Sequence, residues 1–198
     1  MTRPVRLFAF ALVLTSLGSV MLEIQMDMAA DPDEPLGAIL WRLARFFTIL
    51  TNVMVGVTFL RMALVRRNAG TVWLGGLTLW ISITGVVYHA LLARELSGLP
   101  LVSDHGLHTV TPLLTVVYWV LYGPKRGLRV THALTWLIWP LLYVAYALIR
   151  GQLDGTYPYF FTDPTRVGWL GVLRWSGILC AAFFASGLTL VGLSKVLR

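Results

Sequence analysis

Long apolar runs, separated by short polar turns, follow one another along almost the whole chain. A run of about 20 apolar residues is long enough to cross the hydrocarbon core of a bilayer as a helix. Pro, Gly, Asn and Asp cluster between the runs, as is typical of turns. The pattern predicts an all-α integral membrane bundle, one domain over residues 1–198, whose six transmembrane helices cover 7–26, 38–60, 72–92, 104–122, 130–149 and 169–193.

Composition supports a membrane protein. Apolar residues make up 57% of the chain and charged residues only 13%, with a mean hydropathy of +0.74. The net charge of +7 does not indicate nucleic acid, because no basic run exceeds two residues. The single cysteine, Cys180, excludes an intrachain disulfide and any cysteine-based metal or redox cluster.

The distribution of Lys and Arg predicts the orientation. Basic residues are concentrated at both ends of the chain and in the turns after the second and fourth predicted helices, which lie on one side. The positive-inside rule therefore places both termini in the cytoplasm. A cleaved signal peptide over residues 1–30 is an alternative, but Glu23 and Asp27 lie where small residues should precede the cleavage site.

This orientation brings the costly polar groups into one leaflet. The second and fourth predicted helices run inward and the third runs outward, so their polar residues share the outer half of the bilayer. Ionisable residues inside a membrane indicate a functional site by default. The residues concerned are Arg42, Arg45, Thr48, Thr51, Asn52, His89, Asp104, His105 and His108.

Asp104 and His108 are four residues apart, one turn along a helix, so the carboxylate can orient the imidazole. Asp104 is equally suited to cap the start of a helix, and we leave both interpretations open. His105 and His108 form a His-x-x-His pair that can ligate a metal, which makes a metal or haem protein using these residues and His89 a rival hypothesis.

Thr48 and Asn52 are also four residues apart. A threonine in a spanning helix ordinarily bonds its own i−4 carbonyl, whereas one that meets an imidazole can act as a nucleophile. Thr51 competes with Thr48 for that role. Arg42 and Arg45 either hold a carboxylate or headgroup of a lipid or anchor the end of the helix.

Two segments, "FFTILTNVM" (46–54) and "DHGLHTVTP" (104–112), carry a family resemblance. With "YWVLYGPKRGL" (118–128), "WPLLYVAYALIRG" (139–151) and "YPYFFTD" (157–163), the chain resembles the androgen-induced protein family in its bacterial branch. Members of this family are six-span membrane hydrolases that use an intramembrane threonine and histidine. The animal members cleave fatty acid esters of hydroxy fatty acids.

Carried onto this sequence, the resemblance implies Thr48 as the nucleophile, after the two aromatics of "FFT", and His108 as the base, before "TVTP". It also implies a multi-pass protein of the bacterial inner membrane. The chain departs from the family pattern at Thr51 and Asn52, which keeps Thr51 open as the nucleophile.

The sequence therefore predicts a threonine-dependent hydrolase of lipid esters with Thr48 and His108 as catalytic residues. Asp104 and Asn52 are candidates for orienting the base or stabilising an oxyanion. Candidates for binding the substrate are Arg42, Arg45, Thr51, His89 and His105. We expect no cofactor, metal or nucleic acid, and a membrane lipid or fatty acid ester as the partner. A non-catalytic lipid-binding or transport protein is the further alternative.

Overall fold

A computed structural model describes residues 1–197 as all-helical, with α-helices, two π-helical segments, one 3₁₀ turn and no strand in that range. The chain divides into two compact units, Met1–Lys125 and a second that begins at Arg126. Each unit is described by itself. The single domain expected from the sequence stays a prediction.

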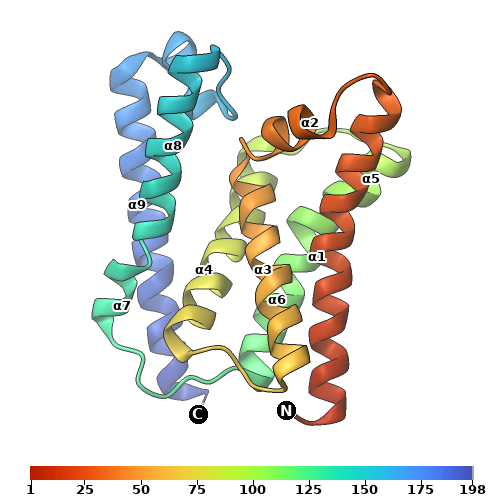
Figure 1. Ribbon diagram of the computed structural model, residues 1–198. Coiled ribbons are helices and arrows are strands. Elements are labelled where there is room, and N and C mark those ends of the chain that lie inside the picture. The colour runs from red at the N-terminus through yellow and green to blue at the C-terminus, as the bar shows by residue number, and fades with distance from the viewer. Residues whose placement is uncertain (198) are drawn as a thin grey trace. The chain divides into compact units, whose positions relative to one another are not determined.

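In the first unit α1 packs along α3 and also contacts α5 and α6, while α4 packs against α3 and α6 (Figure 1). Its core contains large apolar side chains, and the rings of Phe59 and Tyr118 meet edge to face at 4.8 Å between centroids. The helices of this unit are α1 (Arg3–Ala30), α2 (Leu36–Leu43), α3 (Phe47–Val65), α4 (Thr71–Val87), α5 (Gly98–His105) and α6 (Thr111–Tyr122).

Two π-helical segments continue these helices. The segment η1 (Tyr88–Leu92) extends α4, and η2 (Gly106–Val110) joins α5 to α6. Short π segments inside helices are rare and often lie at functional sites.

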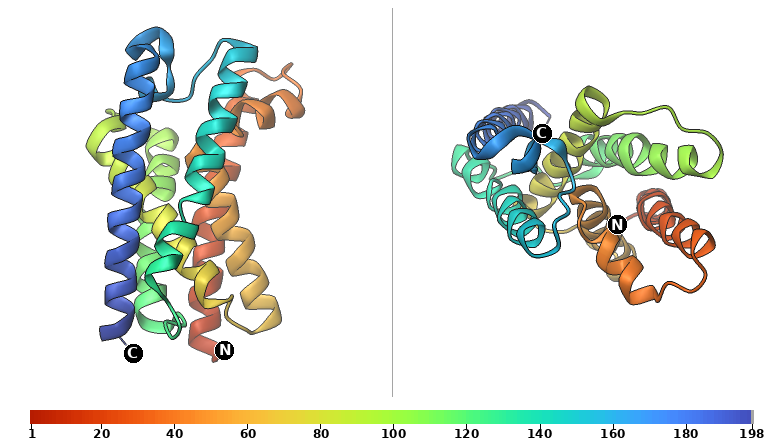
Figure 2. Two further views of the ribbon diagram at one scale, coloured as in Figure 1. Left: turned by 90° about the vertical axis from the view of Figure 1, so that its left-hand side faces the viewer. Right: turned by 90° about the horizontal axis from the view of Figure 1, so that it is seen from above.

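The second unit contains α7 (Val130–Thr135), α8 (Ile138–Asp154), the 3₁₀ turn η3 (Phe160–Thr162) and α9 (Pro164–Val196). Both views of Figure 2 show α8 beside α9 within this unit. The α9 helix bends at Gly168, whose φ of 67° is readily adopted only by glycine. Its straight part therefore begins at Trp169, where the sequence predicted the last helix to start.

Within residues 1–197, five helical stretches are long and apolar enough to cross a membrane: Arg3–Ala30, Phe47–Val65, Thr71–Leu92, Val130–Asp154 and Pro164–Val196. The chain thus has the helices of a multi-pass membrane protein. The expected helix over 104–122 is present and begins earlier, at Gly98. This helix is not among the five apolar stretches. It carries Asp104, His105 and His108 of the segment "DHGLHTVTP".

The continuous helix expected over 38–60 is wrong, because the chain leaves helical geometry between α2 and α3 and Phe46 is extended. No proline or glycine marks this break. Packing holds it instead, since Leu43 and Ile49 on either side of the break join one apolar cluster with Leu107. Tertiary burial overrides the local helix preference here.

Candidate active site

Thr48 lies in the first turn of α3, two residues after the extended Phe46. Its side chain is 8% exposed, and its hydroxyl oxygen Oγ1 lies 3.2 Å from Nε2 of His108. The two residues are 60 positions apart and come from α3 and η2. The fold therefore brings together the hydroxyl and the imidazole that the sequence predicted as partners.

The π segment η2 presents His108 toward α3. At its end, the N–H of Thr111 bonds the carbonyl of Gly106, five residues back. The next residue, Pro112, has no N–H, so it cannot donate to the carbonyl of Leu107 in the same register. Pro112 thus accounts both for the irregular geometry of η2 and for the carbonyl of Leu107 that has no donor within the helix.

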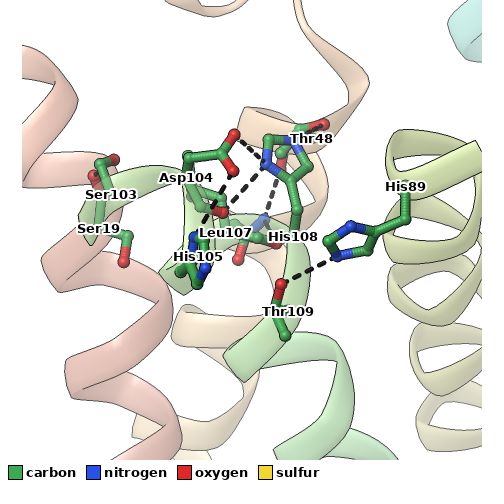
Figure 3. A network of polar contacts seen from close by, with 10 residues as sticks. Ser19, Thr48, His89, Ser103, Asp104, His105, Leu107, His108 and Thr109 are labelled. Atoms are coloured by element: carbon green, nitrogen blue, oxygen red, sulfur yellow. Dashed lines mark hydrogen bonds and ion pairs between the residues drawn. The ribbon is translucent and has the colours of Figure 1, made fainter. Parts of the chain in front are cut away.

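Asp104 completes a three-residue chain of contacts. Its Oδ1 lies 3.0 Å from Nδ1 of His108, and its backbone carbonyl oxygen lies 3.1 Å from the same nitrogen (Figure 3). Two acceptors at Nδ1 favour the imidazole tautomer that carries its proton there. Nε2 is then the acceptor that faces Thr48, as a base must.

The interpretation of Asp104 as a helix cap is wrong. The helix begins at Gly98 with Ser97 before it, so Asp104 lies in its second turn. Pro100 had suggested a turn in the sequence, but proline is tolerated within the first turn of a helix. The contact with Nδ1 of His108 leaves the orienting role open for Asp104.

Asn52 holds the two helices together at this point. It is fully buried, and its Nδ2 donates to the carbonyl of Thr48 at 2.9 Å and to that of Leu107 at 3.2 Å. The second bond satisfies the carbonyl that Pro112 leaves without a helical donor. Because both N–H groups are used, Asn52 positions Thr48 against η2 and has no proton left for an oxyanion.

Three other buried threonines of this unit behave in the ordinary way. Thr78, Thr84 and Thr115 bond the carbonyl four residues before them, as expected for threonine in a buried helix. Thr48 differs from these threonines, because its hydroxyl contacts the imidazole of His108. Thr51 is fully buried in the same helix. The contact with His108 therefore favours Thr48 over Thr51 as the nucleophile.

Arg42 binds two acids of the same unit. Its guanidinium nitrogens lie 2.6 Å from Glu34 Oε1 and 2.9 Å from Asp27 Oδ2. Hydrogen bonds from these carboxylates, that of Glu34 first, raise the pKa of Arg42 above its ordinary value. The pairs tie α2 to the end of α1, so a structural role accounts for Arg42. Arg45 follows α2 at the break, and its role in binding a substrate stays a prediction.

His105 points away from Thr48 (Figure 3), and its side chain is 58% exposed. Its Nδ1 lies 3.9 Å from Asp104 Oδ2, the oxygen that does not face His108. Among residues 1–197, no three His, Cys, Asp or Glu side chains form a group that could hold a metal ion. The pair of histidines therefore has no third protein ligand to offer a metal.

The other π segment, η1, adds two residues to the site. Nε2 of His89 lies 2.9 Å from Oγ1 of Thr109, the residue after His108. The ring of Tyr88 stacks on the imidazole of His108 at 3.7 Å between centroids and 12° between planes. Sequence reasoning did not single out Tyr88 as a site residue, and its one signal is that it precedes a histidine in an apolar helix.

Comparisons of the chain with protein-family models, with curated proteins and with solved structures gave no match.

Proposed function

We propose that this chain is a multi-pass membrane hydrolase that cleaves lipid esters with Thr48 as the nucleophile, His108 as the general base and Asp104 as its orienting carboxylate. The observation that carries the proposal is the order of contacts, from carboxylate to Nδ1 and from Nε2 to hydroxyl. This order is the one that activates a nucleophile in hydrolases with a Ser-His-Asp triad.

The reaction would proceed in two steps. Thr48 Oγ1 attacks the ester carbonyl while His108 Nε2 takes the hydroxyl proton and returns it to the departing alcohol, leaving an acyl-threonine. Water then attacks the acyl carbonyl, gives a proton to His108, and releases the fatty acid with the Thr48 hydroxyl restored. Asp104 stabilises the imidazolium in both steps.

The oxyanion would form at the N-terminal end of α3. Thr48 lies in the first turn of α3, and the first backbone N–H groups of a helix point outward from its N-terminal end. Such N–H groups and the positive end of the helix dipole stabilise developing negative charge. They take the place that the sequence had assigned to Asn52.

The resemblance to the androgen-induced protein family fits this chemistry, and we propose membership of its bacterial branch. In that arrangement six helices span the membrane and both termini are cytoplasmic. The substrate would be a fatty acyl ester that enters from the outer leaflet, close to Thr48 and His108.

Covalent labelling of the purified protein by a fluorophosphonate probe, together with hydrolysis of lipid esters, tests the proposal. We expect labelling at Thr48, located by mass spectrometry of the labelled peptide, and its loss in Thr48→Ala and His108→Ala. Thr115→Val is the matched control, because its hydroxyl bonds its own helix and labelling should persist.

Unchanged labelling in both Thr48→Ala and His108→Ala would refute the assignment. A label on Thr51 would move the nucleophile by one turn. Endogenous lipid that co-purifies and remains uncleaved, with no labelling of the wild type, would favour a lipid-binding protein instead.

A further inference from the structure

We infer that Tyr88 is a positioning residue that fixes the plane of the His108 imidazole against Thr48. The kinetic part of this inference rests on the proposed hydrolase function. The geometric part concerns two rings of η1 and η2 and can be measured without any reaction.

The contact between the rings is close and nearly parallel. The centroids of Tyr88 and His108 are 3.7 Å apart and their planes differ by 12°. Tyr88 is 7% exposed, so the phenol ring covers one face of the imidazole from inside the unit. A parallel neighbour at this distance restricts rotation of the imidazole about its side-chain torsion, and this rotation would carry Nε2 away from Thr48.

Tyr88 also belongs to the polar side of the site, because its phenol lies near enough to the Asp104 carboxylate to feel its charge. The ring restrains the plane of the imidazole that this carboxylate orients.

The two π segments place these residues opposite each other. Tyr88 faces His108. The next residue, His89, bonds the next residue of η2, Thr109 (Figure 3). The carbonyl of Tyr88 bonds the N–H of Ala93, five residues on, so the π register of η1 begins at Tyr88 itself. Consecutive residues of η1 therefore contact consecutive residues of η2.

Gly85 allows this approach. A Cβ at position 85 would lie 2.8 Å from the backbone carbonyl oxygen of His108. The absence of a side chain lets α4 reach η2 closely enough for the next turn to stack Tyr88 on His108.

The stacked ring has a chemical consequence when His108 takes the proton of Thr48. The face of a phenol ring carries negative potential and stabilises a cation above it. Tyr88 is therefore expected to favour the imidazolium that exists only during acyl transfer. Such an interaction raises the rate of acylation and leaves the affinity for the ester unchanged.

The kinetic experiment compares Tyr88→Leu, Tyr88→Phe and Tyr122→Leu in the fluorophosphonate reaction. We expect Tyr88→Leu to lower the rate constant of covalent labelling about three- to tenfold, the range that aromatic pair energies imply, with the reversible affinity for the probe unchanged. Tyr88→Phe keeps the ring and should retain most of the rate. Tyr122→Leu removes a tyrosine that contacts Phe8 and Tyr118, away from the site, and should label like the wild type.

The spectroscopic experiment uses protein with isotope-labelled histidine in detergent micelles. The ring current of Tyr88 should move the imidazole proton signals of His108 upfield, and a spectrum of His108→Gln identifies them among the four histidines of the chain. In Tyr88→Leu these signals should return downfield, while in Tyr88→Phe they should stay.

The two experiments separate the two possible failures. Absence of labelling in the wild type with an intact upfield shift would refute the hydrolase and keep the stacked geometry. His108 signals that do not move in Tyr88→Leu, or a labelling rate constant equal to that of the wild type, would overturn the role of Tyr88.

Discussion

Two threonine–imidazole contacts lie side by side in the first unit, and they differ in what surrounds them. Thr109 and His89 are 2.9 Å apart at an exposed position, whereas Thr48 and His108 are 3.2 Å apart and partly buried. The shorter contact is the less suited to catalysis. His108 has Asp104 at its other ring nitrogen and Tyr88 against its face, so its tautomer and orientation are set.

The comparison shows that a hydroxyl near an imidazole does not define a nucleophile. A base must present an unprotonated nitrogen to the hydroxyl, and the partner of its second nitrogen decides which one that is. Removal from water then strengthens the interaction with the carboxylate. Only the pair in α3 and η2 combines these conditions.

The largest difference should appear when each hydroxyl is removed at constant shape. Thr48→Val is expected to abolish detectable ester turnover, a loss of about 10⁵- to 10⁶-fold if the three residues act as a unit. Thr109→Val should stay within about tenfold of the wild type, because this hydroxyl donates nothing to the acyl group. Turnover of a lipid ester by both purified variants measures the contrast, and equal losses would make the two contacts equivalent.

Neutralising the carboxylate should have the next largest effect. Asp104→Asn keeps the shape but loses the charge and can present an N–H to Nδ1, which favours the wrong tautomer of His108. We expect turnover to fall about 10³- to 10⁴-fold. Asp33→Asn, in the exposed turn before α2, is the control and should be silent. Wild-type turnover in Asp104→Asn would remove the carboxylate from the mechanism.

A smaller effect is expected at Asn52, which holds Thr48 and Leu107 together. Asn52→Leu should lower the stability by about 1–3 kcal/mol, because it leaves a buried carbonyl without a donor, and should also slow labelling as Thr48 shifts. The control is Asn68→Leu, since Asn68 likewise bridges two segments by binding Tyr118 and Tyr122.

Thermal unfolding in detergent and probe labelling distinguish the two asparagines. Both variants should melt earlier, and only Asn52→Leu should label more slowly. Equal labelling by the two would mean that Asn52 is a packing residue only.

A loss of stability of similar size, without the removal of any polar group, is expected where α4 approaches η2. Gly85→Ala should cost about 1–3 kcal/mol, because its Cβ meets the His108 carbonyl, a backbone atom that cannot move aside. Gly18→Ala has open space around its Cβ and should be neutral or stabilise α1 by up to about 1 kcal/mol. The melting temperature of Gly85→Ala should therefore fall, whereas that of Gly18→Ala should stay the same or rise.

Much of the fold follows from the apolar pattern. The helix expected over 72–92 is found over Thr71–Leu92, and the last helix becomes straight at Trp169 as predicted. The starts of both follow a glycine, Gly70 and Gly168, and the backbone preferences of glycine are local. The orientation of the helices placed Thr48 and His108 in the same half of the bilayer, and the family resemblance singled them out as nucleophile and base.

The remaining features depend on contacts distant in the sequence. The break before Phe47 has no local signal and depends on burial against Leu107. The partners of Asn52 and the stacking of Tyr88 follow from the π register of η1 and η2, which no apolar periodicity reveals. Spacing by four residues placed Asp104 beside His108, and the two side chains do meet, because about one helical turn separates them.

The wide turn of η2, which ends at Val110, has a consequence for how this helix tolerates change in length. A π turn holds one residue more than an α turn, so it absorbs the extra residue without turning the flanking helices away from their partners. Deleting one residue from 106–110 would close the segment into an ordinary α turn and leave a helix of much the same length and hydropathy. The helix would stay folded, but side chains within the shortened turn would move by up to one helical step, about 100°, and the imidazole of His108 would leave the hydroxyl of Thr48.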